Sequence, residues 1–261
     1  MAESNTSNNA LKVIDLNIGY KNKSIIENIN FNLKQGELTA IIGVNGIGKS
    51  TLLRTMANAQ EALSGNIEVD DKSLISYTPR ELSSKLSVVL TEPLASKNLS
   101  VIELVALGRQ PYTNWIGTLT TTDKKKIKEA LNVLDLEPLQ HKKCYELSDG
   151  QLQRVMIARA LAQDTSIILL DEPTTHLDLF HKVQILKLLK SIAYNTKKTI
   201  VFTSHEIEMA IQICDQILLL NGKDNPFGRP QDLIEKRVFE RIFPEDVVTF
   251  DATTGTFRIR K

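Results

Sequence analysis

The chain has 261 residues, 42% of them hydrophobic and 24% charged, and a formal net charge of +1 at pH 7. Such a composition is typical of a globular protein, and the length allows one large domain or a domain with an inserted one. The balanced charge gives no reason to expect nucleic acid or another acidic partner. The two cysteines, Cys144 and Cys214, have no metal-ligand companions, so we expect reduced structural thiols.

Residues 1–10, MAESNTSNNA, have neither the basic start nor the apolar stretch of a signal peptide, and we predict a disordered tail. From residue 11 onward, apolar and polar residues alternate. In the stretch NINFNL this alternation places Ile29, Phe31 and Leu33 on one face. The pattern predicts half-buried antiparallel strands up to Leu33, which would form an N-terminal antiparallel β subdomain.

The central part of the chain contains continuous apolar runs. They are LTAII, SVVL, SIILLD, TIVFTS and QILLL. Runs of this kind, separated by helical stretches, predict a mostly parallel central sheet that is covered on both faces. Residues 91–163 have helical character and exceed the length of one crossover helix, so we predict an inserted helical subdomain there. Near the end, DVVTFDATTGTFRIR predicts a hairpin with its turn at Thr254 and Gly255.

The stretch GVNGIGKST directly follows the first of these runs, and its spacing matches the phosphate-binding P-loop between a strand and a helix. Glycines allow backbone N–H groups to surround a polyphosphate, and the helix N-terminus adds partial positive charge. Lys49 would reach the phosphates and Ser50 would bind Mg²⁺. An ordinary glycine-rich turn is the alternative. The predicted nucleotide-binding residues are Gly43, Val44, Asn45, Gly46, Ile47, Gly48, Lys49, Ser50 and Thr51.

A second part of the site is predicted where the apolar run IILL ends in Asp171 and Glu172. The carboxyl ends of parallel strands border the crevice in which a nucleotide binds. Asp171 would hold Mg²⁺, directly or through water, and Glu172 would orient and deprotonate the attacking water. The alternative is a solvated acidic pair at the end of a strand, which the upstream P-loop makes the weaker interpretation.

The segment ELSDGQLQRVMIARALAQD, residues 146–164, resembles the signature segment of ATP-binding-cassette (ABC) ATPases. The resemblance implies that the nucleotide is ATP and that two copies of the chain enclose two ATP molecules in a head-to-tail homodimer. Each ATP would lie between the P-loop of one copy and Ser148, Gly150 and Gln151 of the other. A plain serine N-cap on an amphipathic helix is the alternative for Ser148.

Further elements of that family follow in the family's order. Tyr20 matches the aromatic residue that stacks on adenine, Asp178 the loop at the dimer interface, and His205 the histidine that contacts the γ-phosphate and the attacking water. Taken alone, a tyrosine in a strand more often packs structurally. The resemblance covers residues 11 to about 221. It implies an α/β fold of the P-loop NTPase class, with ATP and Mg²⁺ as cofactors and residues 11–261 as the ABC ATPase domain.

Two residues depart from the family's pattern. Asp149 stands where the signature usually has a glycine, and we expect its carboxylate to point outward, away from a γ-phosphate. Thr91 stands where a glutamine usually senses Mg²⁺, and its hydroxyl is a candidate contact to a metal-bound water. Glu92 is the alternative candidate for this role, so the chemistry of this loop is an open question on the sequence.

The tracts SVIELVALGRQPYTNW and DEPTTHLDLFHKVQILKLL resemble the ABC ATPases that power import of iron–siderophore, haem or cobalamin complexes. This resemblance implies a peripheral subunit at the cytoplasmic face of the cell (inner) membrane. Its partners would be transmembrane permease subunits that work with an extracellular substrate-binding protein. We expect Pro111, Tyr112 and Trp115 at the permease contact, with core packing as the alternative. For His176 and His181 we expect structural or interface roles.

Three other functions are compatible with parts of the sequence. A non-transport ABC ATPase, acting in DNA repair or on ribosomes, would usually carry a coiled-coil insertion, zinc-binding cysteines or a second cassette, and the sequence has no such pattern. An ABC ATPase for another substrate would have the same motifs. A GTPase would recognise guanine with an Asn-Lys-x-Asp motif. The stretch NGKD at residue 221 resembles that motif, but its lysine is displaced, and a GTPase would leave the signature segment unexplained.

Overall fold

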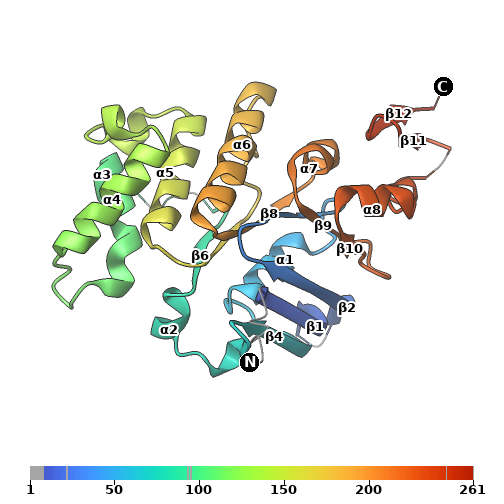
Figure 1. Cartoon of the computed structure of the whole chain (residues 1–261), viewed down its shortest axis with the longest axis horizontal. Coiled ribbons are helices and arrows are strands. Elements are labelled where there is room, and N and C mark those ends of the chain that lie inside the picture. The colour runs from blue at the N-terminus through green and yellow to red at the C-terminus, as the bar shows by residue number, and fades with distance from the viewer. Residues whose placement is uncertain (1–8, 22, 93, 95, 245, 261) are drawn as a thin grey trace, which may run out of the picture.

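The computed structural model describes residues 9–21, 23–92, 94, 96–244 and 246–260. A six-stranded sheet forms its centre, in the order β10-β9-β3-β8-β7-β6 (Figure 1). Its strands are β3 (Leu38–Ile42), β6 (Leu86–Val89), β7 (Ile167–Leu170), β8 (Thr199–Ser204), β9 (Gln216–Leu219) and β10 (Phe227–Gly228). Neighbouring strands are parallel except for β10, which is antiparallel to β9. The predicted mostly parallel sheet is therefore confirmed, and each continuous apolar run supplies one strand.

An antiparallel sheet lies below the central sheet in Figure 1, in the order β2-β1-β4-β5. Its strands are β1 (Asn9–Tyr20), β2 (Lys23–Lys34), β4 (Ser64–Val69) and β5 (Lys72–Ser73). The alternating pattern is confirmed, since Ile29 and Phe31 face Leu16 and Val13 of β1 and all four are buried. The predicted end of the N-terminal tail is wrong by two residues, because Asn9 already pairs with Lys34 at the start of β1. Residues 1–8 lie outside the described residues.

Both faces of the central sheet are covered. The helices involved are α1 (Lys49–Met56), α5 (Asp149–Ala162), α6 (Leu179–Thr196) and α7 (Ile207–Ile213). Ile168 and Phe202 belong to the hydrophobic cluster on the side of α5, α6 and α7. Their neighbours Leu169 and Val201 belong to the cluster that contains α1 and the antiparallel sheet. Because alternate residues enter different cores, these strands need apolar residues at every position.

Helices gather at the opposite end of the molecule from the C-terminus (Figure 1). They are α3 (Val101–Ala106), η2 (Leu107–Tyr112), α4 (Thr121–Val133), η3 (Glu137–Leu139), η4 (Cys144–Glu146) and α5. They fall within residues 91–163, the range predicted as a helical insertion, and we propose that this range is the inserted subdomain. Its η2 segment packs directly on α5, since a Cβ added to Gly108 would lie 2.1 Å from the carbonyl oxygen of Arg159. Only glycine permits this close approach.

A buried ion pair links the elements of this helical end. Arg109 donates to Asp123 of α4 over 2.8 Å, and both side chains are almost completely buried. The guanidinium also donates to the carbonyl oxygen of Ala162 over 2.8 Å, which satisfies the C-terminal end of α5. It lies 4.0 Å from the ring centroid of Tyr112, a cation–π distance. One arginine therefore holds η2, α4 and α5 in a fixed relation.

The remaining elements are α2 (Pro79–Ser83), α8 (Pro230–Glu235), β11 (Val248–Asp251) and β12 (Thr256–Ile259), with the short turns η1 (Leu74–Ser76) and η5 (Phe239–Arg241). Of these, α2 lies beside the edge strand β6 and α8 beside the edge strand β10. The predicted C-terminal hairpin is confirmed, and Gly255 in its turn has a φ of 67°. Within the described ranges, no helix is both long and apolar enough to cross a membrane. Cys144 and Cys214 are buried free thiols, as predicted.

Candidate nucleotide-binding site

The predicted P-loop forms the connection between β3 and α1. Gly46 and Gly48 have φ angles of 78° and 115°, in a region that residues with a Cβ rarely adopt. At Gly43, an added Cβ would lie 2.7 Å from the carbonyl oxygen of Leu220, so the loop backbone packs directly against the end of β9. The loop borders a cavity of about 390 Å³ lined by Asn45, Gly46, Gly48, Lys49, Ser50, Thr51, Glu172 and His205. Of the other predicted loop residues, Val44 is exposed and Ile47 packs against the core.

Lys49 provides a positive charge at the base of this cavity. Its side chain is 5% exposed, and its ammonium donates to the carbonyl oxygens of Gly43 over 3.1 Å and Val44 over 3.3 Å. Burial lowers the pKa of the ammonium below its ordinary value of 10.5, and the carboxylates of Glu172 and Asp171 oppose that effect. The ammonium is thus partly dehydrated and available to a phosphate that enters the loop.

Asp171, at the end of β7, accepts hydrogen bonds from three side-chain hydroxyl groups. Ser50 and Thr203 donate to Oδ1 over 2.9 Å and 2.7 Å, and Thr91 donates to Oδ2 over 2.8 Å. Carboxylate and hydroxyl oxygens are the ligand types that Mg²⁺ prefers, so the set fits this ion. Among the described residues, no group of three or more His, Cys, Asp and Glu side chains could hold a metal by itself. A Mg²⁺ here would take its other ligands from phosphate and water, as is usual for this ion.

Glu172 occupies the turn after β7 with a φ of 44°, which is unusual for a residue with a Cβ. Its Oε2 accepts the Thr175 hydroxyl over 2.9 Å and lies 3.8 Å from Nδ1 of His205. Its Oε1 lies 4.0 Å from the ammonium of Lys49. The fold thus brings together the predicted base, histidine and P-loop lysine, although they come from three different connections after parallel strands. Thr175 was not predicted.

Thr203 is a second residue that the sequence prediction missed. It lies near the end of β8, where its hydroxyl bonds to Asp171 and accepts the backbone N–H of Glu172 over 2.8 Å. The signal in the sequence was a hydroxyl at the carboxyl end of an apolar strand, two positions before His205. That signal is weak, because threonine is also a common strand residue.

Tyr20 lies beside the P-loop and outside the group of residues that line its cavity. Its hydroxyl is 3.2 Å from Oγ1 of Thr51, and 49% of the residue is exposed. A large exposed aromatic ring at the margin of a phosphate loop is available for stacking on a flat ligand. The predicted contact to adenine fits this position.

The two residues that depart from the family pattern line a second cavity, of about 380 Å³, which also contains Asp171 and Glu172. The Thr91 hydroxyl is bonded to Asp171, whereas Glu92 pairs with Arg54 over 3.0 Å. Asp149 is solvent-exposed, as an outward-pointing side chain should be, but it still borders this cavity. The start of α5 thus faces the carboxyl edge of the sheet, and the orientation of the Asp149 carboxylate away from a γ-phosphate stays a prediction.

The signature residues occupy the first turn of α5. Ser148 accepts the N–H of Gln151 over 3.3 Å, and Gln151 accepts the N–H of Ser148 over 3.1 Å, which is a capping box. Gly150 lies against the His181 ring, which an added Cβ would approach to 3.4 Å. None of the three signature residues lines the cavity of the P-loop within the described part of the chain. One copy therefore does not bring the two predicted halves of the ATP site together.

Asp178 caps the N-terminus of α6. It accepts the backbone N–H of His181 over 2.9 Å and is also bonded to that residue's ring. These hydrogen bonds hold the pKa of the Asp178 carboxyl below its ordinary range. The adjacent Leu179 and Phe180 are each 66% exposed. The predicted interface residue thus stands next to an exposed apolar pair.

Comparison with known proteins places these elements in one family. Residues 26–175 match the family model of ABC transporters. The petrobactin import ATP-binding protein FpuD of Bacillus anthracis is 33% identical over 249 residues, which are 95% of this chain and 91% of that protein. An ABC transporter of the metal-chelate type, solved in an inward-facing conformation, gives a TM-score of 0.79 at 30% identity and covers 96% of each chain. The dimeric bacterial ABC transporter cassette MJ0796 gives a TM-score of 0.69 at 30% identity over 80% of this chain and 94% of that one.

The range that matches the family model contains the P-loop, the signature turn of α5 and the Asp171–Glu172 pair. The similarity to the import protein and to the solved transporter extends beyond these motifs over nearly the whole chain. The chain therefore belongs to the ABC transporter family and is one of its ATP-binding domains, which hydrolyse ATP.

Proposed function

We propose that this chain is the ATPase subunit of an importer for an iron chelate, either a siderophore or haem, or for cobalamin. The subunit would act at the cytoplasmic face of the cell (inner) membrane on transmembrane permease subunits, with an extracellular binding protein delivering the substrate. The similarity to a petrobactin import protein and to a metal-chelate type transporter supports this substrate class. The observation that carries the proposal is that Ser148, Gly150 and Gln151 lie outside the cavity that the P-loop and Glu172 border.

The geometry supports a separate role in ATP hydrolysis for each residue of the site. P-loop amides and Lys49 would bind the phosphates, and Tyr20 would stack on the adenine. Ser50 and Asp171 would hold Mg²⁺, which when bound supplies charge neutralisation on the phosphate oxygens. Glu172 would accept the proton of the attacking water, since its carboxylate borders the P-loop cavity and is oriented by Thr175. His205, 3.8 Å from that carboxylate, would contact the γ-phosphate.

A homodimer would complete the site. In a head-to-tail pair, Ser148, Gly150 and Gln151 of the second copy would approach the γ-phosphate, with the capped N-terminus of α5 adding partial positive charge. The partner would also cover the exposed pair Leu179 and Phe180 beside Asp178. The dimeric cassette similar to this chain supports that arrangement.

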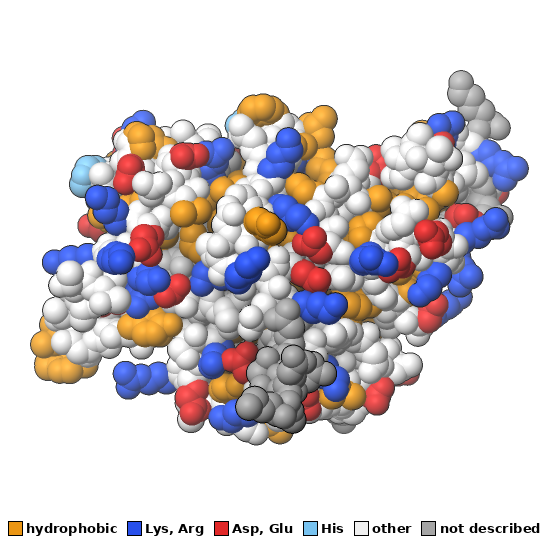
Figure 2. All heavy atoms as spheres, in the orientation of Figure 1, with side chains coloured by type: hydrophobic (Ala, Val, Ile, Leu, Met, Phe, Trp, Pro, Cys, Tyr) orange, Lys and Arg blue, Asp and Glu red, His pale blue; other side chains and the backbone are white. Residues whose placement is uncertain are grey.

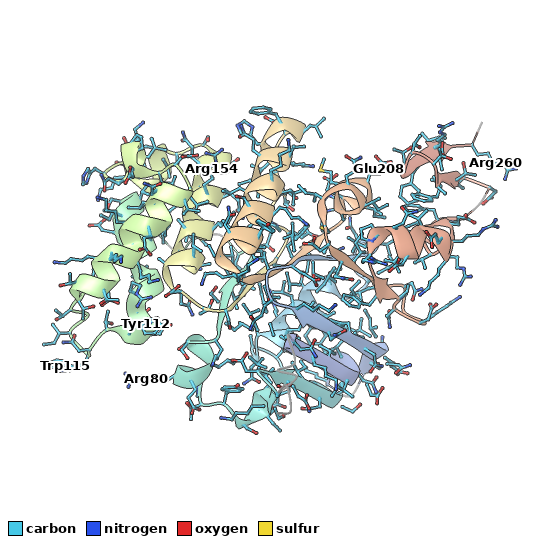
Figure 3. All side chains as sticks on the ribbon, in the orientation of Figure 1. Arg80, Tyr112, Trp115, Arg154, Glu208 and Arg260 are labelled. Carbon is cyan, nitrogen blue, oxygen red and sulfur yellow. The ribbon has the colours of Figure 1, made fainter. Side chains whose placement is uncertain are left out.

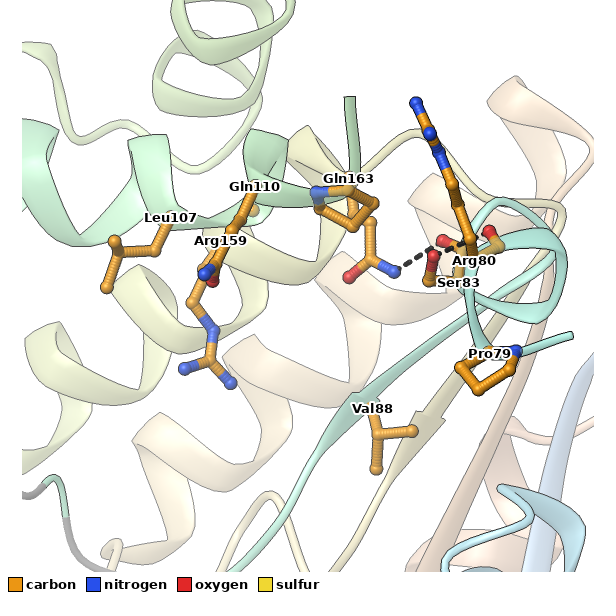
Figure 4. A pocket seen from close by; sticks show the side chains of 10 residues that line it. Pro79, Arg80, Ser83, Val88, Leu107, Gln110, Arg159 and Gln163 are labelled. Carbon is orange, nitrogen blue, oxygen red and sulfur yellow. Dashed lines mark hydrogen bonds between the residues drawn. The ribbon is translucent and has the colours of Figure 1, made fainter. Parts of the chain in front are cut away.

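A groove between α2 and the helical end is the proposed permease contact (Figure 4). Its volume is about 500 Å³, and it is lined by Pro79, Arg80, Ser83, Val88, Leu107, Gly108, Gln110, Pro111, Arg159 and Gln163. Burial lowers the pKa of the Arg159 guanidinium, and this group forms no ion pair within the described residues. A permease segment that presents carboxylate or carbonyl oxygens would therefore fit the groove.

Apolar side chains next to the groove support the same assignment. Figure 2 shows hydrophobic groups at the tip of the helical end, and Figure 3 shows Tyr112 and Trp115 at the same corner as Arg80. Trp115 is 94% exposed, so the alternative of core packing is wrong for this residue. Pro111 lines the groove, and Tyr112 stacks on Arg109. Large exposed aromatic residues of this kind are typical of a protein interface.

A charge placed in this groove should abolish permease binding. Leu107 is 47% exposed at the groove, and Leu107→Asp would put a buried charge into the contact. We expect co-purification with the co-expressed permease to be lost while basal ATP hydrolysis stays at the parental rate. Val133→Asp on α4 is the matched control, because Val133 is 40% exposed outside the groove. Equal co-purification of both variants would contradict the assignment.

Removal of the aromatic ring at position 20 tests the proposed contact to adenine. Tyr20→Ala should weaken ATP binding by roughly tenfold, since base stacking on an aromatic ring contributes about 1–3 kcal/mol. Tyr20→Phe keeps the ring and loses only the hydroxyl near Thr51, so it should bind ATP like the parent. Both variants are compared with the parent by their affinity for a fluorescent ATP analogue. A parental affinity of Tyr20→Ala would show that the ring does not stack on the base.

The import function is tested with the complete system. The chain would be purified with its permease, and ATP hydrolysis would be assayed against haem, ferric siderophores and cobalamin with their capture proteins. We expect stimulation by one of these classes. Absence of stimulation by all of them, together with failure to bind a permease, would favour the non-transport alternative or another substrate. The family match makes the GTPase alternative wrong.

A further inference from the structure

Strand β8 carries two completely buried threonines, Thr199 near its start and Thr203 near its end. The Thr199 hydroxyl donates to the carbonyl oxygen of Lys34 over 3.0 Å, far from the nucleotide site. The Thr203 hydroxyl lies between the two carboxylate residues of the site. It donates to Oδ1 of Asp171 over 2.7 Å and accepts the backbone N–H of Glu172 over 2.8 Å.

These two bonds fix the direction of the Thr203 proton. A hydroxyl has one proton to donate, and here the approach of the Glu172 N–H occupies the acceptor side of the oxygen, so the proton points to Asp171. Ser50 and Thr91 also donate to Asp171, but each lines a cavity and can turn toward a ligand. Thr203 lines neither of those cavities. It is therefore the one of these three donors that keeps its bond to Asp171 when the site fills.

The same hydroxyl supports the turn that carries the general base. Leu170 pairs with Phe202 in the parallel ladder, so Asp171 and Thr203 follow side by side at the strand ends. Glu172 then adopts a φ of 44°, a conformation that persists only where its surroundings hold it. The bond from the Glu172 N–H to Thr203 ties that turn to β8. Loss of the hydroxyl would leave a buried N–H and a buried carboxylate oxygen each short of one partner.

We propose that Thr203 is a positioning residue for ATP hydrolysis. It holds one carboxylate oxygen of Asp171 in place as a Mg²⁺ ligand, and it sets the backbone from which Glu172 reaches the attacking water. The inference rests on the proposed metal role of Asp171. Residues that orient a metal ligand in this way typically change metal affinity or activity by 10–100-fold when they are replaced.

The test removes the hydroxyl and keeps the volume. Thr203→Val should bind a fluorescent ATP analogue in EDTA as the parent does, whereas the gain in affinity on adding Mg²⁺ should fall by roughly tenfold or more. Turnover at saturating Mg-ATP should fall in the same range. Thr203→Ser keeps the hydroxyl and should recover most of the Mg²⁺-dependent gain. If Thr203→Val does not fold, Thr203→Cys replaces it, because a thiol is only a weak donor and should give a loss in the same direction.

Two further variants separate the possible results. Thr199→Val removes a buried hydroxyl from the same strand away from the site, and it should affect thermal stability without changing the Mg²⁺-dependent gain. If Thr203→Val also lowers only the melting temperature while Asp171→Asn loses the gain, Thr203 is merely structural and the inference is overturned. If Asp171→Asn keeps the full gain, the proposed metal role of Asp171 is wrong and the inference fails with it.

Discussion

Glu172→Gln is expected to lower ATP turnover by about 10²-fold or more, because an amide cannot accept the proton of the attacking water. The substitution keeps the size of the side chain and its position 4.0 Å from Lys49, so nucleotide binding should remain. Without hydrolysis, the ATP-bound homodimer should persist. Phosphate release at saturating Mg-ATP measures the first effect, and size-exclusion chromatography with ATP measures the second.

The matched control for this variant is Glu129→Gln on α4. Glu129 forms ion pairs with Lys125 and Lys126 on the surface of α4, and surface ion pairs contribute little to the stability of a protein. We expect parental turnover and no trapped dimer. Hydrolysis by Glu172→Gln at the parental rate would show that another group takes the proton. A slow variant that stays monomeric with ATP would instead contradict the proposed shared site.

Lys49→Met is expected to reduce turnover by about 10²–10³-fold, the size of the effect when a preorganised charge partner of a reacting group is lost. Methionine can follow the path of the buried lysine stem, but it cannot donate to phosphate oxygens. Binding of the fluorescent ATP analogue should weaken as well. Lys187→Met, on the exposed surface of α6, is the control and should behave as the parent. Parental turnover by Lys49→Met would contradict the P-loop assignment.

The same variant has a consequence for stability that follows from the lowered pKa of Lys49. Between that lowered pKa and 10.5, the unfolded chain binds more protons at this residue than the folded chain does. The free energy of unfolding of the nucleotide-free protein should therefore gain a contribution that rises with pH through this window. Lys49→Met should lack that contribution. Urea unfolding at a series of alkaline pH values measures the difference, and identical slopes would contradict it.

Local sequence patterns were sufficient for the strands and for the P-loop. Continuous apolar runs identify strands such as β7 and β8 because a sheet covered on both faces needs apolar residues at every position. The P-loop spacing is equally local, since its glycines and Lys49 act within one turn between a strand and a helix. The start of β1 was predicted less well, because the polar residue Asn9 has no apolar signal of a strand. Asn9 nevertheless belongs to β1, since its backbone pairs with Lys34.

Contacts between distant segments escaped the sequence analysis. Thr203 reads as an ordinary strand residue, and only the parallel register of β7 and β8 places its hydroxyl between Asp171 and Glu172. The groove that contains Arg159 likewise depends on how α5, η2 and α2 pack. Sequence by itself determined the phosphate loop, the acidic strand end and the signature turn, because each is encoded in neighbouring residues. Only the tertiary structure decided which hydroxyls, carboxylates and cations contact one another. These contacts join residues far apart in the chain, and they depend on strand register and helix packing.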